Sequence, residues 1–249
     1  MSTRRDSLSS IQLSHVSDAH AELWLDRYMD DVEKSEKRSA FVAEVSTISI
    51  PTIYETFYNR WIQELESLGA KKREAHVKTR MIVGLGDESV LETSVTLHKT
   101  YGVPYIPGSA LKGLAASYAR QRLTEDWQKG REAYQVIFGD PDEAGYITFF
   151  DALYIPEPGT KKRVLYPDVI STHHQKYYQN FAQTPADWDD PIPIPFLTAT
   201  GDYMIALAAP ELNERDAWIE KTFTILKYAL ADMGIGAKTS SGYGRLELK

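Results

Sequence analysis

The segment between Gly234 and Gly244 has a composition suited to binding an anion. Small and polar residues dominate it, in the order Gly234, Gly236, Lys238, Thr239, Ser240, Ser241, Gly242 and Gly244. Glycine lets the backbone turn several N–H groups towards one point, and Lys238 adds a positive charge. The spacing is not that of a nucleotide-hydrolysing P-loop, because Ala237 precedes the lysine and a final strand is predicted to follow. The segment therefore predicts a phosphate-holding loop, the alternative being a flexible connection between helix and strand.

A second candidate anion site lies at Pro107–Ser109, directly before a predicted helix. Gly108 permits a sharp turn, and Ser109 is expected to cap a helix that runs to about Leu123. The first turn of a helix exposes unpaired N–H groups and a partial positive charge, and Lys112 would add to it. The same residues also fit an ordinary capped helix with a solvated lysine.

The groups that could transfer protons are scattered along the chain. They are His76, His98, His173, His174, Asp87, Asp151 and Asp168. The densest cluster is His173-His174 beside Tyr177, yet adjacent residues of a strand point to opposite sides, and no HxxxH or HExxH spacing marks a metal site. The chain has no cysteine. We therefore expect no catalytic residue, metal or cofactor. His173 and Tyr177 suit stacking on or hydrogen-bonding to unpaired bases, the alternatives being packing against a neighbouring subunit and catalysis.

The charge of the chain is unevenly distributed. The net charge is −7, which argues against a general nucleic-acid binder. Residues 71–122 nevertheless carry nine Lys and Arg against four acids, a net of +5, so the other 197 residues carry −12. Arg80 and Lys99 of this basic segment are candidate RNA contacts; simple solvation of surface helices is the alternative explanation.

Hydrophobic periodicity divides the chain into two parts. Residues 1–75 predict a mainly helical, acidic addition that contacts protein, with a surface helix at 20–37, a strand or extended arm at 40–51, and a helix at 53–69. The second part, 76–249, predicts strands at 76–85, 145–155, 163–169, 193–209 and 243–248, and helices at 109–123, 125–137 and 213–233. Its insertion around 156–192 reads as irregular. The order strand, helix, strand, strand, helix, strand is the split βαβ pattern, so we expect an α+β, ferredoxin-like or RRM-like fold with an antiparallel sheet.

The ends and the apolar content of the chain bear on its location. No apolar stretch typical of a secretory signal follows the first residues, and no run of about 18 apolar residues occurs. We therefore expect a soluble, cytoplasmic protein with no membrane contact.

Both candidate loops also carry a family resemblance. "YIPGSALKG" after a first strand, paired with "GIGAKTSSGYGRL" near the C-terminus, resembles the RAMP superfamily of CRISPR proteins. The segments "IFGDPDEAGYITFFDA", "DVISTHHQKYY" and "PIPFLTATGDYMIAL" narrow the resemblance to the family of sixth subunits of type III-B (Cmr) effector complexes. One departure is Ala116, where many RAMP proteins have arginine; Arg120, one turn later, is a candidate replacement.

The resemblance implies a RAMP core with helical additions, in an antiviral effector that uses guide RNA to capture foreign RNA. This chain would be a non-catalytic RNA-binding and assembly subunit that holds the 3′ portion of the guide. Its implied partners are guide RNA, target RNA as a further candidate, other RAMP subunits of the complex and the small helical subunit. A metal-independent RAMP endoribonuclease that processes guide precursors is the alternative, and a purely protein-binding scaffold is the third.

Overall fold

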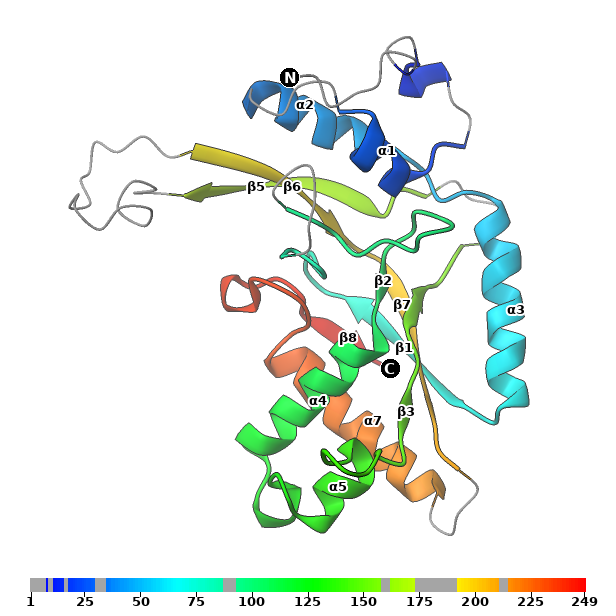
Figure 1. Ribbon diagram of the computed structural model, residues 1–249, viewed down its shortest axis with the longest axis vertical. Helices are drawn as coiled ribbons and strands as arrows, with labels where there is room; N and C mark the ends of the chain where they lie inside the picture. The colour runs from blue at the N-terminus through cyan, green and yellow to red at the C-terminus, as the bar shows by residue number, and fades with distance from the viewer. Residues whose placement is uncertain are drawn as a thin grey trace, which may run out of the picture.

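The chain folds around one antiparallel sheet, with helices on both of its faces (Figure 1). The computed structural model describes residues 8, 11–15, 18–29, 35–86, 93–157, 162–172, 192–210 and 215–249. The helices are α1 (Ala21–Arg27), α2 (Ser35–Val45), α3 (Ile53–Ser67), α4 (Gly108–Arg122), α5 (Glu132–Phe138) and α7 (Arg215–Asp232), with short 3-10 turns η2 (Leu13–His15), η3 (Glu125–Trp127) and η4 (Thr239–Ser241). The strands are β1 (Lys71–Val77), β2 (Tyr105–Ile106), β3 (Thr148–Phe149), β4 (Ala152–Tyr154), β5 (Leu165–Thr172), β6 (Ile192–Ala199), β7 (Asp202–Ala208) and β8 (Leu246–Leu248).

The central sheet has the predicted ferredoxin-like connectivity. Its strand order is β2-β4-β7-β1-β8, and β3 also pairs with β7. Along the chain the core elements follow as β1, α4, β4, β7, α7 and β8, so the first and third core strands are adjacent at the centre. This is the split βαβ arrangement, and the prediction of an α+β fold with an antiparallel sheet is confirmed.

Adjacent residues of β1 show which helices cover which face. Arg73 reaches α7, where it pairs with Glu220 and lies over the Phe223 ring. Lys72 points the other way and pairs with Glu66 of α3. Because neighbouring strand residues alternate between faces, α7 and α3 lie on opposite sides of the sheet, as Figure 1 shows. The helix α4 packs against α7 and so belongs to the same layer.

The N-terminal part differs from its prediction in one element. Residues 40–51 were expected to form a strand or arm, but α2 continues to Val45. The apolar residues Phe41, Val42 and Val45 have helical spacing and are buried, and α2 packs on the β5–β6 hairpin. The surface helix expected at 20–37 corresponds to α1, which is shorter and ends at Arg27; it exposes Leu23 and buries Trp24 and Leu25 on its other side.

The strand boundaries differ from the predicted ranges in three places. The first strand begins at Lys71, not at 76, and ends at Val77. In the rest of the range that was predicted to be a strand, 78–85, Met81 forms an isolated bridge with Ala199 of β6. The predicted strand 193–209 is two strands, β6 and β7, separated at Thr200-Gly201. Strand β5 was expected beside 145–155 but pairs with β6 in a separate hairpin. The strand expected at 163–169 is thus present as β5, which continues to Thr172; residues 173–191, the main part of the stretch expected to be irregular, lie outside the described part.

The hydrophobic core joins both predicted parts of the chain. One cluster of buried side chains extends from Ala19 to Leu248. A buried hydrogen bond links the first part to the sheet, since the Tyr54 hydroxyl of α3 donates to the Tyr154 carbonyl of β4 at 2.8 Å. Burial raises the pKa of Tyr54, so its hydroxyl keeps the proton that it donates. Among the described helices, none has the length and apolar character needed to cross a membrane.

Tyr54→Phe tests this link between α3 and the sheet. The substitution removes a buried hydrogen bond, so we expect the free energy of unfolding to fall by about 1–2 kcal/mol. Tyr58→Phe is the matched control on the same helix, because no hydrogen bond from the Tyr58 hydroxyl is found in the described part of the chain. Urea unfolding followed by tryptophan fluorescence measures both; equal losses would show that the bond to Tyr154 contributes nothing specific.

Candidate nucleic-acid interface

The glycine-rich loop, residues 234–244, connects α7 to β8 and packs on the chain that leaves β1. The Ala237 N–H donates to the Ile82 carbonyl at 2.7 Å, and the Gly244 N–H donates to the Arg80 carbonyl at 2.8 Å. Within the loop, the Ile235 N–H donates to the Gly244 carbonyl at 2.8 Å. The loop is therefore held by backbone contacts on its inner side, and it projects beside β8 in Figure 1.

Close backbone approach explains two of the glycines. A Cβ on Gly236 would lie 2.0 Å from the Ile82 carbonyl oxygen, and one on Gly244 would lie 2.0 Å from the Ile235 carbonyl oxygen. Both residues also have positive φ, 87° and 73°. These glycines are therefore required by packing, which the sequence analysis had instead attributed to phosphate binding. Gly242 differs: its φ is 91°, but a Cβ there would meet nothing within 4 Å.

The tip of the loop, residues 238–242, presents a smaller set of anion-binding groups than predicted. The N–H groups of Ser241, Gly242 and Tyr243 donate back to carbonyls of Lys238 and Thr239. Within the described structure, the N–H groups of Lys238, Thr239 and Ser240 have no acceptor. Lys238, Ser240 and Ser241 are exposed, and Lys238 has φ 57°. The tip thus combines three consecutive amides, one ammonium group and hydroxyls.

Arg80 connects the loop to the base of the β5–β6 hairpin. Its guanidinium donates to Asp168 at 3.0 Å and to the Pro167 carbonyl at 2.9 Å, and lies over the Tyr166 ring. The Tyr243 hydroxyl donates to the same Asp168 carboxylate at 2.9 Å. Burial and this carboxylate raise the pKa of Tyr243. Arg80 is therefore placed to fix the loop and the hairpin relative to each other.

The turn before α4 is built differently from the prediction. The helix begins at Gly108, its N-cap is Pro107 with no side-chain cap, and Ser109 lies exposed in the first turn. Ser109 is therefore not the N-cap. The Gly108 N–H donates to Asp151 at 2.8 Å, so a carboxylate of the chain already occupies one of the N-terminal amides. A Cβ on Gly108 would lie 2.1 Å from the Phe149 carbonyl oxygen, so this glycine too is required by packing.

The two loops lie at opposite edges of the sheet. The turn before α4 follows β2, one edge strand, whereas the glycine-rich loop precedes β8, the other edge strand. Four strand spacings separate these edges, about 19 Å. The predicted residues therefore form two separate regions, and a ligand that touches both must extend across the sheet.

The basic segment 71–122 is largely neutralised by acids from elsewhere in the chain. Six of its nine cations form ion pairs: Lys71–Asp216, Lys72–Glu66, Arg73–Glu220, Lys78–Glu247, Arg80–Asp168 and Lys99–Glu22. Glu22 raises the pKa of Lys99, mainly through their hydrogen bond. Lys112, Arg120 and Arg122 have no ion pair within the described ranges. Lys99 is therefore bound to α1 in this conformation, and Lys112 remains a free charge near the turn.

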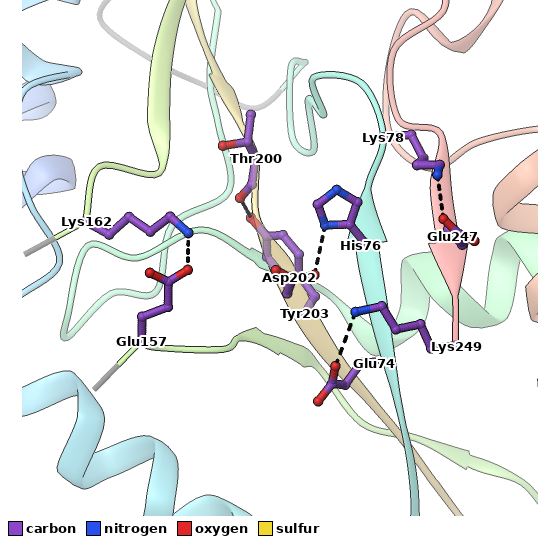
Figure 2. A network of polar contacts seen from close by, with 10 residues as sticks. All are labelled: Glu74, His76, Lys78, Glu157, Lys162, Thr200, Asp202, Tyr203, Glu247 and Lys249. Carbon is purple, nitrogen blue, oxygen red and sulfur yellow. Dashed lines mark hydrogen bonds and ion pairs between the residues drawn. The ribbon is translucent and has the colours of Figure 1, made fainter. Parts of the chain in front are cut away.

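Among the proton-transfer candidates that the structure describes, His76 and His98 lie in different surroundings. Figure 2 shows His76 on β1 with its Nδ1 2.9 Å from Asp202, between the cross-strand ion pairs Glu74–Lys249 and Lys78–Glu247. His98 instead packs among the rings of Phe57, Tyr101 and Tyr105. The sequence analysis missed the β1 pairs, although the charges alternate at every second residue, as expected for one polar face of a strand.

The remaining proton-transfer candidates either form hydrogen bonds within the chain or lie outside the described residues. Asp151 accepts from Gly108, and Asp168 accepts from Arg80 and Tyr243. His173, His174, Tyr177 and Asp87 lie outside the described residues. In the ranges that the structure does describe, no three His, Asp or Glu side chains are grouped to hold a metal.

The close contact at Gly236 makes a prediction about stability. Gly236→Ala forces a Cβ against the Ile82 carbonyl at positive φ, so we expect a loss of about 2 kcal/mol or more. Gly242→Ala has only the positive φ to overcome and should cost about 1 kcal/mol.

Gly113→Ala is the control, because it lies in α4 with open space at its Cβ, and it should stabilise by up to about 1 kcal/mol. Chemical unfolding of the three variants gives the order. A cost at Gly236 no larger than at Gly242 would contradict the packing explanation.

Comparisons with known proteins agree with this fold. The sequence model of the RAMP superfamily matches residues 74–247. The CRISPR system Cmr subunit Cmr6 of Pyrococcus furiosus is 34% identical over 249 residues, which cover 78% of this chain and 72% of that protein. The Cmr6 subunit of Saccharolobus solfataricus is 27% identical over 184 residues, which cover 70% of this chain and 56% of that protein.

A solved chain provides a structural comparison. It comes from the cryo-EM structure of the type III-B Cmr-beta bound to cognate target RNA, and it matches with a TM-score of 0.65 over 98% of this chain and 84% of that chain. Its sequence identity is 20%, so it bears on the fold alone. The extent of the family match and the identity to the Pyrococcus subunit lead to one conclusion: the chain belongs to the RAMP superfamily and is a relative of the Cmr6 subunits of CRISPR systems.

Proposed function

We propose that the chain is a non-catalytic RNA-binding and assembly subunit of a type III-B CRISPR effector complex, in antiviral defence. The observation that carries the RNA-binding part is the loop tip, with its three unengaged amides, the Lys238 ammonium and exposed hydroxyls. These groups suit the phosphate backbone and not base edges, because they offer donors without a base-specific pattern. Family membership supports the partners: guide RNA held towards its 3′ portion, target RNA, other Cmr RAMP subunits and the small helical subunit.

The candidate residues take unequal parts in this proposal. Lys238, Thr239, Ser240, Ser241 and Gly242 contact phosphate, whereas Gly234 and Gly236 hold the loop in shape. At the second region, Ser109 and Lys112 remain available to RNA, and Gly108 shapes the turn. Arg80 positions the loop through Asp168, and Lys99 binds RNA only if it leaves Glu22. His173 and Tyr177 stay proposed contacts of the insertion.

The tip makes a prediction about affinity. Lys238→Ala removes one phosphate contact, so the slope of log affinity against log salt should decrease by about one unit. Gly242→Val should weaken binding more, because valine is strained at the positive φ of Gly242 and shifts the neighbouring amides.

Lys129→Ala is the control, an exposed cation away from the loop. Fluorescence anisotropy with several unrelated single strands over a salt series measures all four proteins. A strong preference for one sequence, a flat salt response, or a larger loss for Lys238→Ala than for Gly242→Val would contradict backbone reading by the amides.

The surroundings of His98 make a prediction about catalysis. Burial lowers the pKa of His98 below its usual value near 6.5, with Asp151 opposing the shift. His98 is then neutral at pH 7, a form that cannot donate a proton as a general acid but can accept one as a general base, so cleavage has to be tested directly. Because its folded pKa lies below its unfolded pKa, its contribution to stability is complete above pH 6.5 and is lost as pH falls below that value.

NMR titration of the His98 ring should give a pKa below 6.5. The purified chain, given guide precursor and complementary target RNA with Mg²⁺ or Mn²⁺, should release no products. Cleavage that disappears in His98→Ala or His173→Ala would instead select the endoribonuclease.

A further inference from the structure

An apolar groove lies between α4 and α7, on the side of the helical layer away from the sheet. It has a volume of about 380 Å³, and its floor is formed by Tyr118 and Ile225, which are 8% and 5% exposed. Leu123 and Trp127 form one wall, where α4 ends and the chain turns into η3. On the α7 side stands Tyr228, which is 53% exposed. A large aromatic side chain so open to water beside an apolar hollow is a typical interaction site.

The charges around the groove are unequally satisfied. Glu220, the acid that lines the groove, pairs with Arg73. Asp126, next to Trp127 in η3, is exposed and has no ion pair within the described residues. The cations around the groove have no acidic partner in the part of the chain that the structure describes: Lys221 lies over the Trp218 ring, and Arg122 is exposed at the end of α4. Of the charged side chains that line the groove, Glu220 is therefore neutralised and Lys221 is not, so the groove complements an apolar surface that brings a carboxylate to Lys221.

We propose that this groove binds an amphipathic helix of a protein partner, with aliphatic or aromatic side chains against Tyr118, Ile225 and Tyr228 and a carboxylate beside Lys221. A helix suits the site because two helices form the groove, and apolar side chains at i, i+3 and i+4 fill such a hollow. A stacked nucleobase is the other occupant that these rings could hold, and an RNA adduct in the experiment below would identify it. The inference rests on the assembly part of the proposed function and is independent of the RNA contacts.

Photo-crosslinking in the assembled complex tests the occupant. A benzophenone amino acid replaces Tyr228 in the full chain, which is then assembled with guide RNA and the other subunits of its own effector. We expect a cross-link to a helical segment of another subunit that carries acidic residues. The same probe at Tyr146, 49% exposed and outside the groove, is the control and should not capture that segment. An adduct with RNA, an adduct with a second copy of this chain, or the absence of a protein adduct would overturn the proposal.

Charge reversal tests the contact proposed for Lys221. Lys221→Glu should lower retention of the cross-linked subunit at least about tenfold, because it places like charges together. Lys227→Glu, on the same helix but outside the groove, should leave retention unchanged. A reciprocal acid-to-lysine change in the captured segment should restore binding to Lys221→Glu. Equal effects of the two reversals would refute the assigned contact.

The same variants separate this inference from RNA binding. Lys221→Glu should not alter the affinity of the free chain for RNA, which belongs to the loop tip. If the free chain binds no RNA while the cross-link and the charge swap succeed, the RNA proposal fails and the groove assignment stands. If RNA binds as expected and the cross-link fails, the groove assignment fails and the RNA proposal stands.

Discussion

The contact between the Gly236 backbone and the Ile82 carbonyl fixes the C-terminal half of the functional region. With only 2.0 Å available for a Cβ, the loop can lie against the chain leaving β1 only if glycine stands at this position. The adjacent bond from the Ala237 N–H to Ile82, and that from Gly244 to Arg80, then set where the loop turns and where β8 begins. These inner contacts determine the position of the exposed tip, residues 238–242. Residues proposed to bind RNA and residues that hold the loop are therefore close in sequence but separate in role.

The charges of the chain also divide into those that hold its elements together and the few that remain for a ligand. A net charge of −7 would repel RNA over the whole surface, and the excess of cations in residues 71–122 is mostly consumed by internal ion pairs. Those pairs join α1, α3, α7 and β8 to the central strand and its neighbours, so they serve to orient elements. Any attraction for phosphate must then come from local groups, where amides and single cations act at short range and salt screens more distant charges. We therefore expect this chain to contact RNA at a few points, with the other subunits of a larger complex contributing the rest of the binding.

The sequence could predict the core fold because its signals are local. Each signal is contained in about a dozen residues: alternating polar and apolar residues mark a strand, Pro107-Gly108 marks a helix start, and the glycine-rich loop marks the end of the last helix. The order of these elements is enough to predict the split βαβ topology. The sequence predicted strands at the positions of β5 and β6 but not their pairing, because the two strands pair across residues 173–191 and no short turn marks them as a hairpin. Pro167, Pro193 and Pro195 lie within these strands. A two-stranded hairpin has two free edges, so prolines that would break a central strand are tolerated there.

The candidate site was predictable in its residue types and not in its hydrogen bonding. Composition identifies Gly234–Gly244 as a candidate anion-binding loop, but it cannot show that the Ser241, Gly242 and Tyr243 amides bond within the loop while those of residues 238–240 do not. Nor can it show that Asp151 already meets the Gly108 amide, because those residues are brought together by the pairing of β2 with β4. What remains after these internal contacts is a tip beyond one edge of the sheet and a groove on the outer side of the helices. Because the two share no residue, the proposed contacts to a nucleic acid and to a protein helix do not compete for the same side chains.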